Sequence, residues 1–272
     1  MPTCCCMNRV VELVRTGAVA IERFDHTPGA SHRDPDRELT TAHGVNFIEA
    51  GSFQVRTTGP WVPVATDRLF VTRPGLEFSC AHGEDHPSDR CLSVSYSDEA
   101  IEGARSTLTL DEAVVRPLTN RQAYLHLALQ DCGDGSEARA EALAGALLHS
   151  LSRAVAPHPL FKPDRIAWYA SRVDRAKAII DAHYADKLSL SDLARDAGMS
   201  LFHFARVFGE LEGRPPHRVL KEVRLAHARA RLQDGASVTD TCFAVGFGSL
   251  SHFVTTFRRH YGVSPSRISR VR

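Results

Sequence analysis

The sequence predicts an α+β protein of two domains, in which an N-terminal domain of β-strands and a helical hairpin precedes an all-α domain with two helix-turn-helix units. Short β-prone runs alternate with turn residues between residues 39 and 96, and helical periodicity dominates from residue 166 onward. The charge also changes along the chain, because residues 1–165 carry 16 Lys and Arg against 22 Asp and Glu, whereas residues 166–272 carry 17 against 10. A chain of 272 residues is long enough for two such domains.

The composition is that of an ordinary globular protein. Hydrophobic residues make up 43% and charged residues 24% of the chain, and no run of about 18 apolar residues occurs. The N-terminal stretch MPTCCCMNRV lacks the apolar segment of a secretory signal. The 7 cysteines, an odd number with three adjacent at Cys4–Cys6, do not resemble a disulfide framework. We therefore expect a cytoplasmic protein with no membrane partner.

The N-terminal domain, residues 1–154, is expected to be a β-sandwich or barrel. Its β-branched and aromatic residues cluster in short runs that glycine and proline separate. The expected strands contain Phe47–Ile48, Phe53–Val55, Trp61–Val64 and Leu69–Val71, and the turns contain Gly51, Gly59–Pro60 and Pro74–Gly75. Many short strands joined by regular turns are typical of these two architectures.

A helical hairpin and a linker are expected to follow the strands. The helices are marked by apolar residues at helical spacing, Tyr124, Leu125, Leu127 and Leu129 in the first and Leu143, Ala146, Leu147 and Leu151 in the second. The break CGDGS separates them, and their apolar stripe packs either on this domain or on a second subunit. Prolines at 157, 159 and 163 then predict a stiff linker over residues 155–165.

The C-terminal domain, residues 166–272, repeats a plan of helix, glycine turn and helix. The turns are expected at Gly198 and Gly246, and the second helix of each unit begins just after a capping serine, Ser200 or Ser249. A long helix with the sequence RLAHARARL joins the two units. Because the domain is basic and rich in arginine, we expect nucleic acid as its partner.

The second helix of each unit has the pattern of a helix that reads a DNA groove. Phenylalanines at helical spacing, Phe204 and Phe208 in one unit and Phe253 and Phe257 in the other, are expected in the core. The residues expected to face DNA are Phe202, His203, Ala205 and Arg206 in the first helix and Leu250, Ser251, His252, Thr255, Arg258 and Arg259 in the second. Small polar and weakly apolar groups suit base edges and thymine methyls, whereas the two arginines near the end of the second helix suit phosphates.

These motifs resemble the AraC/XylS family of bacterial transcription regulators. The resemblance rests on LSDLARDAGMS in the first unit, RLAHARARL in the joining helix and AVGFGSLSHFVTTFRRHYGVSP in the second unit. Thr241 and Cys242 depart from the aliphatic residue and alanine usual in the family, and Cys242 is expected to replace alanine in the core. The resemblance implies a homodimer that binds double-stranded DNA, acts as an activator and has RNA polymerase as a further partner. It also implies an N-terminal cupin-like barrel that binds a small effector.

The segment CAHGEDHPSDRC gathers thiol and imidazole side chains in the N-terminal domain. Cys80, His82, His86 and Cys91 would satisfy tetrahedral Zn²⁺ or another thiophilic metal ion. The two cysteines could instead form a redox-sensing thiol pair. An organic effector inside the barrel, or no small ligand at all, are the other interpretations that the sequence leaves open.

The alternative function is a metal-dependent cupin enzyme fused to a DNA-binding module. His43, His82 and His86 with Glu84 would supply its metal ligands. The spacing of these residues does not match a recognisable constellation, and neither a nucleophile motif nor a glycine-rich phosphate loop occurs. We therefore expect a regulator without enzymatic activity.

Overall fold

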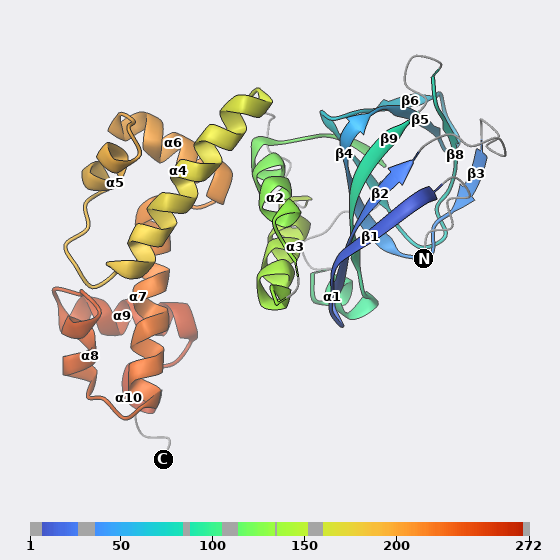
Figure 1. Cartoon of the computed structure of the whole chain (residues 1–272). Coiled ribbons are helices and arrows are strands. Elements are labelled where there is room, and N and C mark those ends of the chain that lie inside the picture. Colours follow the sequence, from blue (N-terminus) through green and yellow to red (C-terminus); the bar gives the residue numbers. More distant parts are fainter. Residues whose placement is uncertain are drawn as a thin grey trace. The chain divides into compact units, whose positions relative to one another are not determined.

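The computed structural model describes residues 7–26, 36–83, 88–104, 114–133, 135–151 and 160–268. The chain divides into two compact units, Met1–Lys162 and Pro163–Arg272, and each is described here by itself (Figure 1). None of the helices in the described ranges combines the length and the apolar character needed to cross a bilayer.

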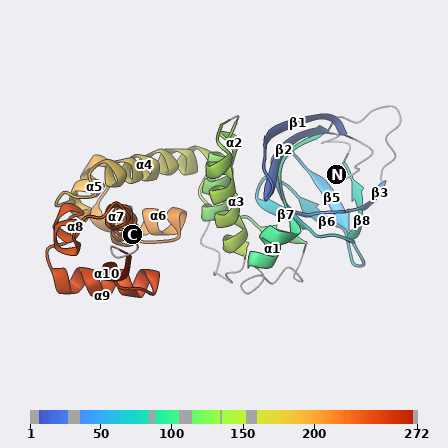
Figure 2. The ribbon, with the colours of Figure 1, turned by 90° about the horizontal axis from the view of Figure 1, so that it is seen from below.

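The N-terminal unit contains two antiparallel sheets (Figure 2). The 6-stranded sheet has the order β1 (Met7–Arg15), β2 (Val19–His26), β9 (Asp89–Tyr96), β4 (His43–Gly51), β7 (Arg68–Thr72) and β10 (Val115–Pro117). The 4-stranded sheet has the order β3 (Asp36–Leu39), β8 (Glu77–Ala81), β5 (Phe53–Arg56) and β6 (Val62–Val64). The four strands expected from the sequence are confirmed as parts of β4 to β7, except that β6 begins at Val62 and leaves Trp61 outside.

The central strands of the larger sheet are buried on both faces. Successive residues of a strand point to opposite faces, and Phe47 and Ile48 of β4 enter different apolar clusters. Ile48 packs with side chains of the smaller sheet, such as Phe53 and Val55. Phe47 packs with residues of the helices, such as Leu129. Cross-strand pairing is confined within each sheet in the described residues, so the closed cupin-like barrel stays a prediction.

Three helices accompany the larger sheet, α1 (Asp98–Ala104), α2 (Asn120–Gln130) and α3 (Glu137–Leu151). Helices α2 and α3 form the expected hairpin (Figure 1). Their apolar residues Leu125, Ala144 and Leu147 belong to the same buried cluster as the sheet residues, so the stripe packs on its own domain. The sequence alone leaves this choice open.

The C-terminal unit is entirely helical in its described residues. Its helices are α4 (Pro163–Ala182), α5 (Leu190–Asp196), α6 (Leu201–Glu212), α7 (Pro216–Gln233), α8 (Val238–Ala244), α9 (Leu250–Tyr261) and α10 (Pro265–Ile268). Helix α4 begins at Pro163, inside the expected linker 155–165, because the missing N–H of a proline is harmless in the first turn of a helix. Residues 155–159 of that linker lie outside the described residues.

Candidate nucleic-acid interface

The two helix-turn-helix units are α5 with α6 and α8 with α9, and α7 lies between them in the chain (Figure 1). The predicted caps are confirmed: Ser200 Oγ accepts a hydrogen bond from the His203 N–H, and Ser249 Oγ accepts one from the His252 N–H, each at 3.4 Å. Both helices end at a glycine with positive φ, Gly213 at 73° and Gly262 at 74°. Helices α6 and α9 therefore begin at the same type of serine cap and end at the same type of glycine.

Helix α9 separates a buried face from an exposed face. Phe253 and Phe257 are 0% exposed and pack on Leu225 and other residues of α7 and α8. All α9 side chains predicted to face DNA are exposed, namely Leu250, Ser251, His252, Thr255, Arg258 and Arg259. Ser251, Thr255 and Arg258 lie at three- and four-residue spacing, so they share one side of the helix. The burial pattern confirms the predicted core, and Cys242 is also fully buried as expected.

Helix α6 places its predicted residues less uniformly. Phe202 is 86% exposed and Arg206 is exposed, whereas His203 and Ala205 are half-buried. His203 Nε2 lies 3.1 Å from the Tyr169 hydroxyl of α4, which fixes this imidazole to the scaffold. The Arg206 guanidinium lies 3.2 Å from Glu210 Oε2 and 3.4 Å from His203 Nδ1. An exposed ion pair of this type contributes less than about 1 kcal/mol, so Arg206 can exchange Glu210 for a base or a phosphate at little cost.

Arg224 of α7 joins the two halves of the C-terminal unit, a role that the sequence did not reveal. Its Nε donates to the carbonyl of Tyr184 at 2.7 Å and its Nη2 to the carbonyl of Asp186 at 2.9 Å. Those carbonyls lie in the segment between α4 and α5, and burial lowers the pKa of the guanidinium. The same guanidinium borders Gly246, where an added Cβ would lie 3.0 Å from Cζ. The Arg224 side chain therefore contacts both the segment that leads into α5 and the glycine turn of the second unit.

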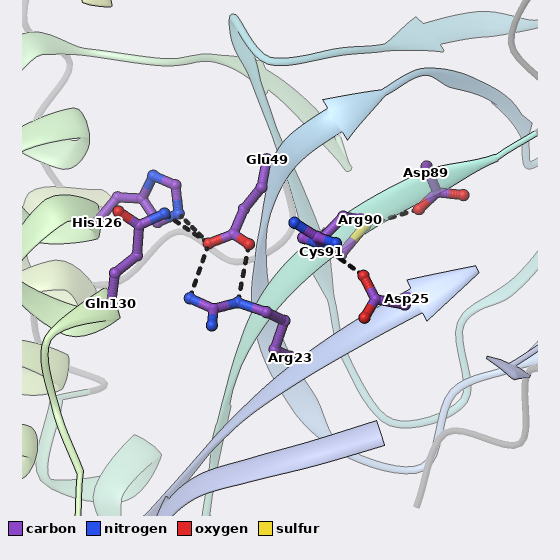
Figure 3. A network of polar contacts seen from close by, with 8 residues as sticks. All are labelled: Arg23, Asp25, Glu49, Asp89, Arg90, Cys91, His126 and Gln130. Carbon is purple, nitrogen blue, oxygen red and sulfur yellow. Dashed lines mark hydrogen bonds and ion pairs between the residues drawn. The ribbon is translucent and has the colours of Figure 1, made fainter. Parts of the chain in front are cut away.

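A polar network connects α2 to the larger sheet of the N-terminal unit (Figure 3). Glu49 of β4 accepts hydrogen bonds from Arg23 Nε at 2.9 Å and Gln130 Nε2 at 2.6 Å, and its Oε1 lies 3.3 Å from His126 Nε2. Burial alone would raise the pKa of Glu49, but the hydrogen bonds from His126, Gln130 and Arg23 outweigh it and lower the pKa to about 2. The charged carboxylate thus ties a helix to two strands.

The network predicts a pH-dependent contribution to stability. A carboxyl whose pKa falls from 4.5 to about 2 on folding stabilises the fold above about pH 4.5, and this stabilisation is lost as the pH falls through 2. Glu49→Gln is therefore expected to lower the free energy of unfolding by about 2 kcal/mol at pH 7, and by less than about half of that at pH 3. Urea unfolding at both pH values measures the difference. Glu12→Gln, which removes an exposed carboxylate, is the control, and an equal effect of the two variants would contradict the assignment.

The cysteine and histidine cluster is only partly as predicted. His86 lies outside the described residues, as does Glu84. Cys80 and Cys91 both line a cavity of about 130 Å³ in the N-terminal unit. His82, however, lies beside His26 and Asp89, which the prediction did not include. Burial, together with the nearby Asp89 carboxylate, raises the pKa of the Cys91 thiol well above its usual value.

The ligand set of the alternative enzyme is not assembled in the described residues. Across residues 7–26, 36–83, 88–104, 114–133, 135–151 and 160–268, the only group of three or more closely spaced His, Cys, Asp or Glu donors is His26, His82 and Asp89. His43 is not a member of this group, and Glu84 and His86 lie outside the described residues. The sequence missed His26 because it precedes His82 by more than fifty residues and reaches the site only through strand pairing.

Comparisons with known proteins agree with this geometry. A family model described as a helix-turn-helix domain matches residues 193–270. The HTH-type transcriptional regulator ExsA of Pseudomonas aeruginosa is 28% identical over 249 residues, which cover 86% of this chain and 80% of ExsA. The HTH-type transcriptional activator RhaS of Escherichia coli is 36% identical over 100 residues, which cover 36% of each chain.

Among solved structures, the DNA-binding domain of the transcriptional factor AdpA in complex with a target DNA is similar to this chain. It has 28% sequence identity and a TM-score of 0.35, and the match covers 36% of this chain and 89% of the AdpA domain. These relatives are named as a regulator and an activator of transcription.

Proposed function

The chain belongs to the AraC/XylS family of DNA-binding transcription regulators, and on this premise we propose that it activates transcription under the control of a small ligand bound by its N-terminal unit. The observation that carries the proposal is the pair of helices α6 and α9, which have matching caps, buried aromatic roots and exposed outer faces. As an activator it would act as a homodimer that contacts RNA polymerase.

Each chain would contact two neighbouring stretches of duplex. Helices α6 and α9 would enter successive major grooves about one turn, or roughly 34 Å, apart. Contacts by α7 support this arrangement, because Arg224 fixes the segment that leads into the first unit and also borders the turn of the second. A single chain would then read an asymmetric, bipartite site, and a homodimer would read two copies of it.

The outer faces of the two helices differ in what they offer to DNA. Helix α6 presents Phe202 for apolar contact with bases and Arg206 for a guanine or a phosphate. Helix α9 presents Ser251 and Thr255 for base edges, and Arg258 in its last turn for the sugar–phosphate backbone. His203 would act mainly by orienting Arg206, because its ring is held against Tyr169.

The cavity between the two sheets of the N-terminal unit is the candidate effector site. Aromatic side chains such as Phe24, Phe53 and Phe78 line it together with polar side chains such as Thr40 and Asn46. Its volume of about 130 Å³ is close to that of an engineered cavity of about 150 Å³ that accommodates benzene, so the ligand would be small. Such a ligand would regulate DNA binding only if it favours one of two states of the protein.

Selection of bound duplexes from a random pool, at two salt concentrations, tests the proposed DNA recognition. The wild type is expected to select a bipartite site, with a salt dependence that reports the number of phosphates contacted. Arg206→Ala is expected to relax the preference at one base pair at a cost of about 1–3 kcal/mol, whereas Arg258→Ala should weaken binding to all sequences and reduce the salt slope by about 1.

Arg37→Ala is the matched control for this experiment, because it removes an exposed arginine from the N-terminal unit. It is expected to leave both the selected sequence and the salt slope unchanged. If Arg206→Ala and Arg258→Ala also behave like this control, α6 and α9 are not the reading helices.

A further inference from the structure

We propose that His26, His82 and Asp89 form a site for Zn²⁺ or a similar borderline divalent cation in the N-terminal unit, and that Cys91 completes the ligand set after its side chain moves toward them. The proposal adds to the proposed function, because it names a class of ligand for the effector cavity. Only the regulatory consequence of metal binding rests on that function, and the metal site itself does not. It also replaces the ligand set that the sequence predicted, since His26 and Asp89 come from strands β2 and β9.

Strand pairing and the fold bring the three ligands together from both sheets. His26 ends β2 and Asp89 begins β9, and the two residues are direct partners in the antiparallel ladder. Side chains of such partners lie on the same face of a sheet, with Cβ atoms about 5 Å apart. His82 follows β8 of the other sheet by one position. An ion held by all three would therefore connect the two sheets.

The three donor atoms of His26, His82 and Asp89 lie within 4.8 Å of one another. His82 Nε2 lies 2.8 Å and His26 Nδ1 lies 3.4 Å from the same atom, Asp89 Oδ1. The imidazole rings meet edge to face, with centroids 4.3 Å apart. Ligands about 2.1 Å from a tetrahedral zinc ion are roughly 3.4 Å from one another. Two imidazole nitrogens that point at one carboxylate oxygen can exchange that contact for a shared cation with small movements.

Cys91 borders the group of three donors without belonging to it, and a movement of its side chain would bring Sγ in as the fourth donor. It follows Asp89 by two positions on β9, so both side chains lie on the same face of the sheet. Its Sγ donates a hydrogen bond to Asp89 Oδ2 at 3.0 Å (Figure 3). On binding a cation the thiol would release its proton to solvent and bind as the thiolate, while Asp89 binds through a carboxylate oxygen.

The donor set and its burial select the class of ion. Two imidazoles, a carboxylate and a thiolate suit Zn²⁺, whereas Ca²⁺ and Mg²⁺ require oxygen ligands. The side chains of His82 and Asp89 are 3% and 7% exposed, so a cation there would compensate a buried negative charge. His26, Asp89 and Cys91 also line the effector cavity, which provides a route for the ion. Binding would clamp β8 to β2 and β9 and so fix one arrangement of the two sheets.

Metal titration of the full-length protein, stripped with a chelator, tests the site. The wild type is expected to bind one equivalent of Co²⁺ with the visible absorption of tetrahedral coordination and a sulfur-to-cobalt charge-transfer band, and Zn²⁺ should displace it. His82→Gln and Asp89→Asn are expected to weaken Zn²⁺ binding about 100-fold. Cys91→Ser should remove the charge-transfer band. His149→Gln, on the exposed face of α3, and Cys132→Ser are the matched controls and should bind like the wild type.

Thermal unfolding separates loss of the site from loss of the fold. Zn²⁺ is expected to raise the melting temperature of the wild type and the controls, but not that of His82→Gln, which should match the wild type in the presence of chelator. Equal metal binding by the wild type and His82→Gln would overturn the proposal, and metal bound at Cys4–Cys6 would give that result. Octahedral cobalt in the wild type would also overturn it. DNA binding by the same samples tests the proposed function separately, because it does not depend on any metal signal.

Discussion

Phe253→Ala is expected to unfold the second helix-turn-helix unit and to abolish specific DNA binding. Phe253 is 0% exposed, and its ring centroid lies 5.1 Å from that of Phe247 and 5.6 Å from that of Phe257. Truncation of a buried phenylalanine costs about 3–5 kcal/mol, through lost burial and the cavity that remains. That is a large part of the total stability of about 5–15 kcal/mol that a domain has. Because Phe253 anchors α9 in the core of the C-terminal unit, its loss would deprive the exposed residues of α9 of their common orientation.

Thr255→Ala separates this effect from the loss of a DNA contact. Thr255 lies on the same helix but is exposed, so its truncation should change stability by less than about 0.5 kcal/mol. Urea unfolding followed by circular dichroism, together with DNA-binding titrations, measures both quantities. Thr255→Ala should keep the wild-type stability and lose affinity, whereas Phe253→Ala should lose both. If the Phe253→Ala protein is as stable as the Thr255→Ala protein, the folding of α9 does not depend on the buried ring of Phe253.

The candidate interface was predictable because its determinants are local in the sequence. Ser200 and Ser249 begin the two helices, and Phe253 and Phe257 lie one helical turn apart on the buried face. A cap, a glycine turn and a helical period act over a few residues, so they can be recognised without knowledge of the fold. Strands β4 to β7 and the hairpin of the N-terminal unit were predictable for the same reason.

Features that depend on distant residues could not be predicted. His26 meets Asp89 only because β2 and β9 pair in one register, and a shift by one residue would turn His26 to the other face. The long helix was expected, but nothing in its sequence indicates that Arg224 binds the carbonyls of Tyr184 and Asp186. Strands β1 and β2 were also missed, because charged residues interrupt their apolar runs.

Gly246→Ala is expected to disrupt the C-terminal unit far more than the same change at Gly198. Both glycines lie in the turns of the helix-turn-helix units and have positive φ, 84° at Gly246 and 65° at Gly198, so each substitution strains the backbone by about 1–2 kcal/mol. The surroundings differ. A Cβ at Gly246 would lie 2.7 Å from the carbonyl oxygen of Ala185 and 3.0 Å from Arg224 Cζ, whereas a Cβ at Gly198 would meet nothing within 4 Å.

The clash at Gly246 cannot be relieved cheaply, because the segment that contains Ala185 is held by Arg224 through the carbonyls on either side of it. We expect Gly246→Ala to cost about 2–4 kcal/mol in total, and Gly198→Ala about half as much. Displacement of this segment also disturbs the approach to α5, so Gly246→Ala should weaken binding to a bipartite site more than binding to either half-site. Urea unfolding and titrations with full and half-sites measure both effects. Equal destabilisation by the two substitutions would mean that Arg224 does not hold the two units together.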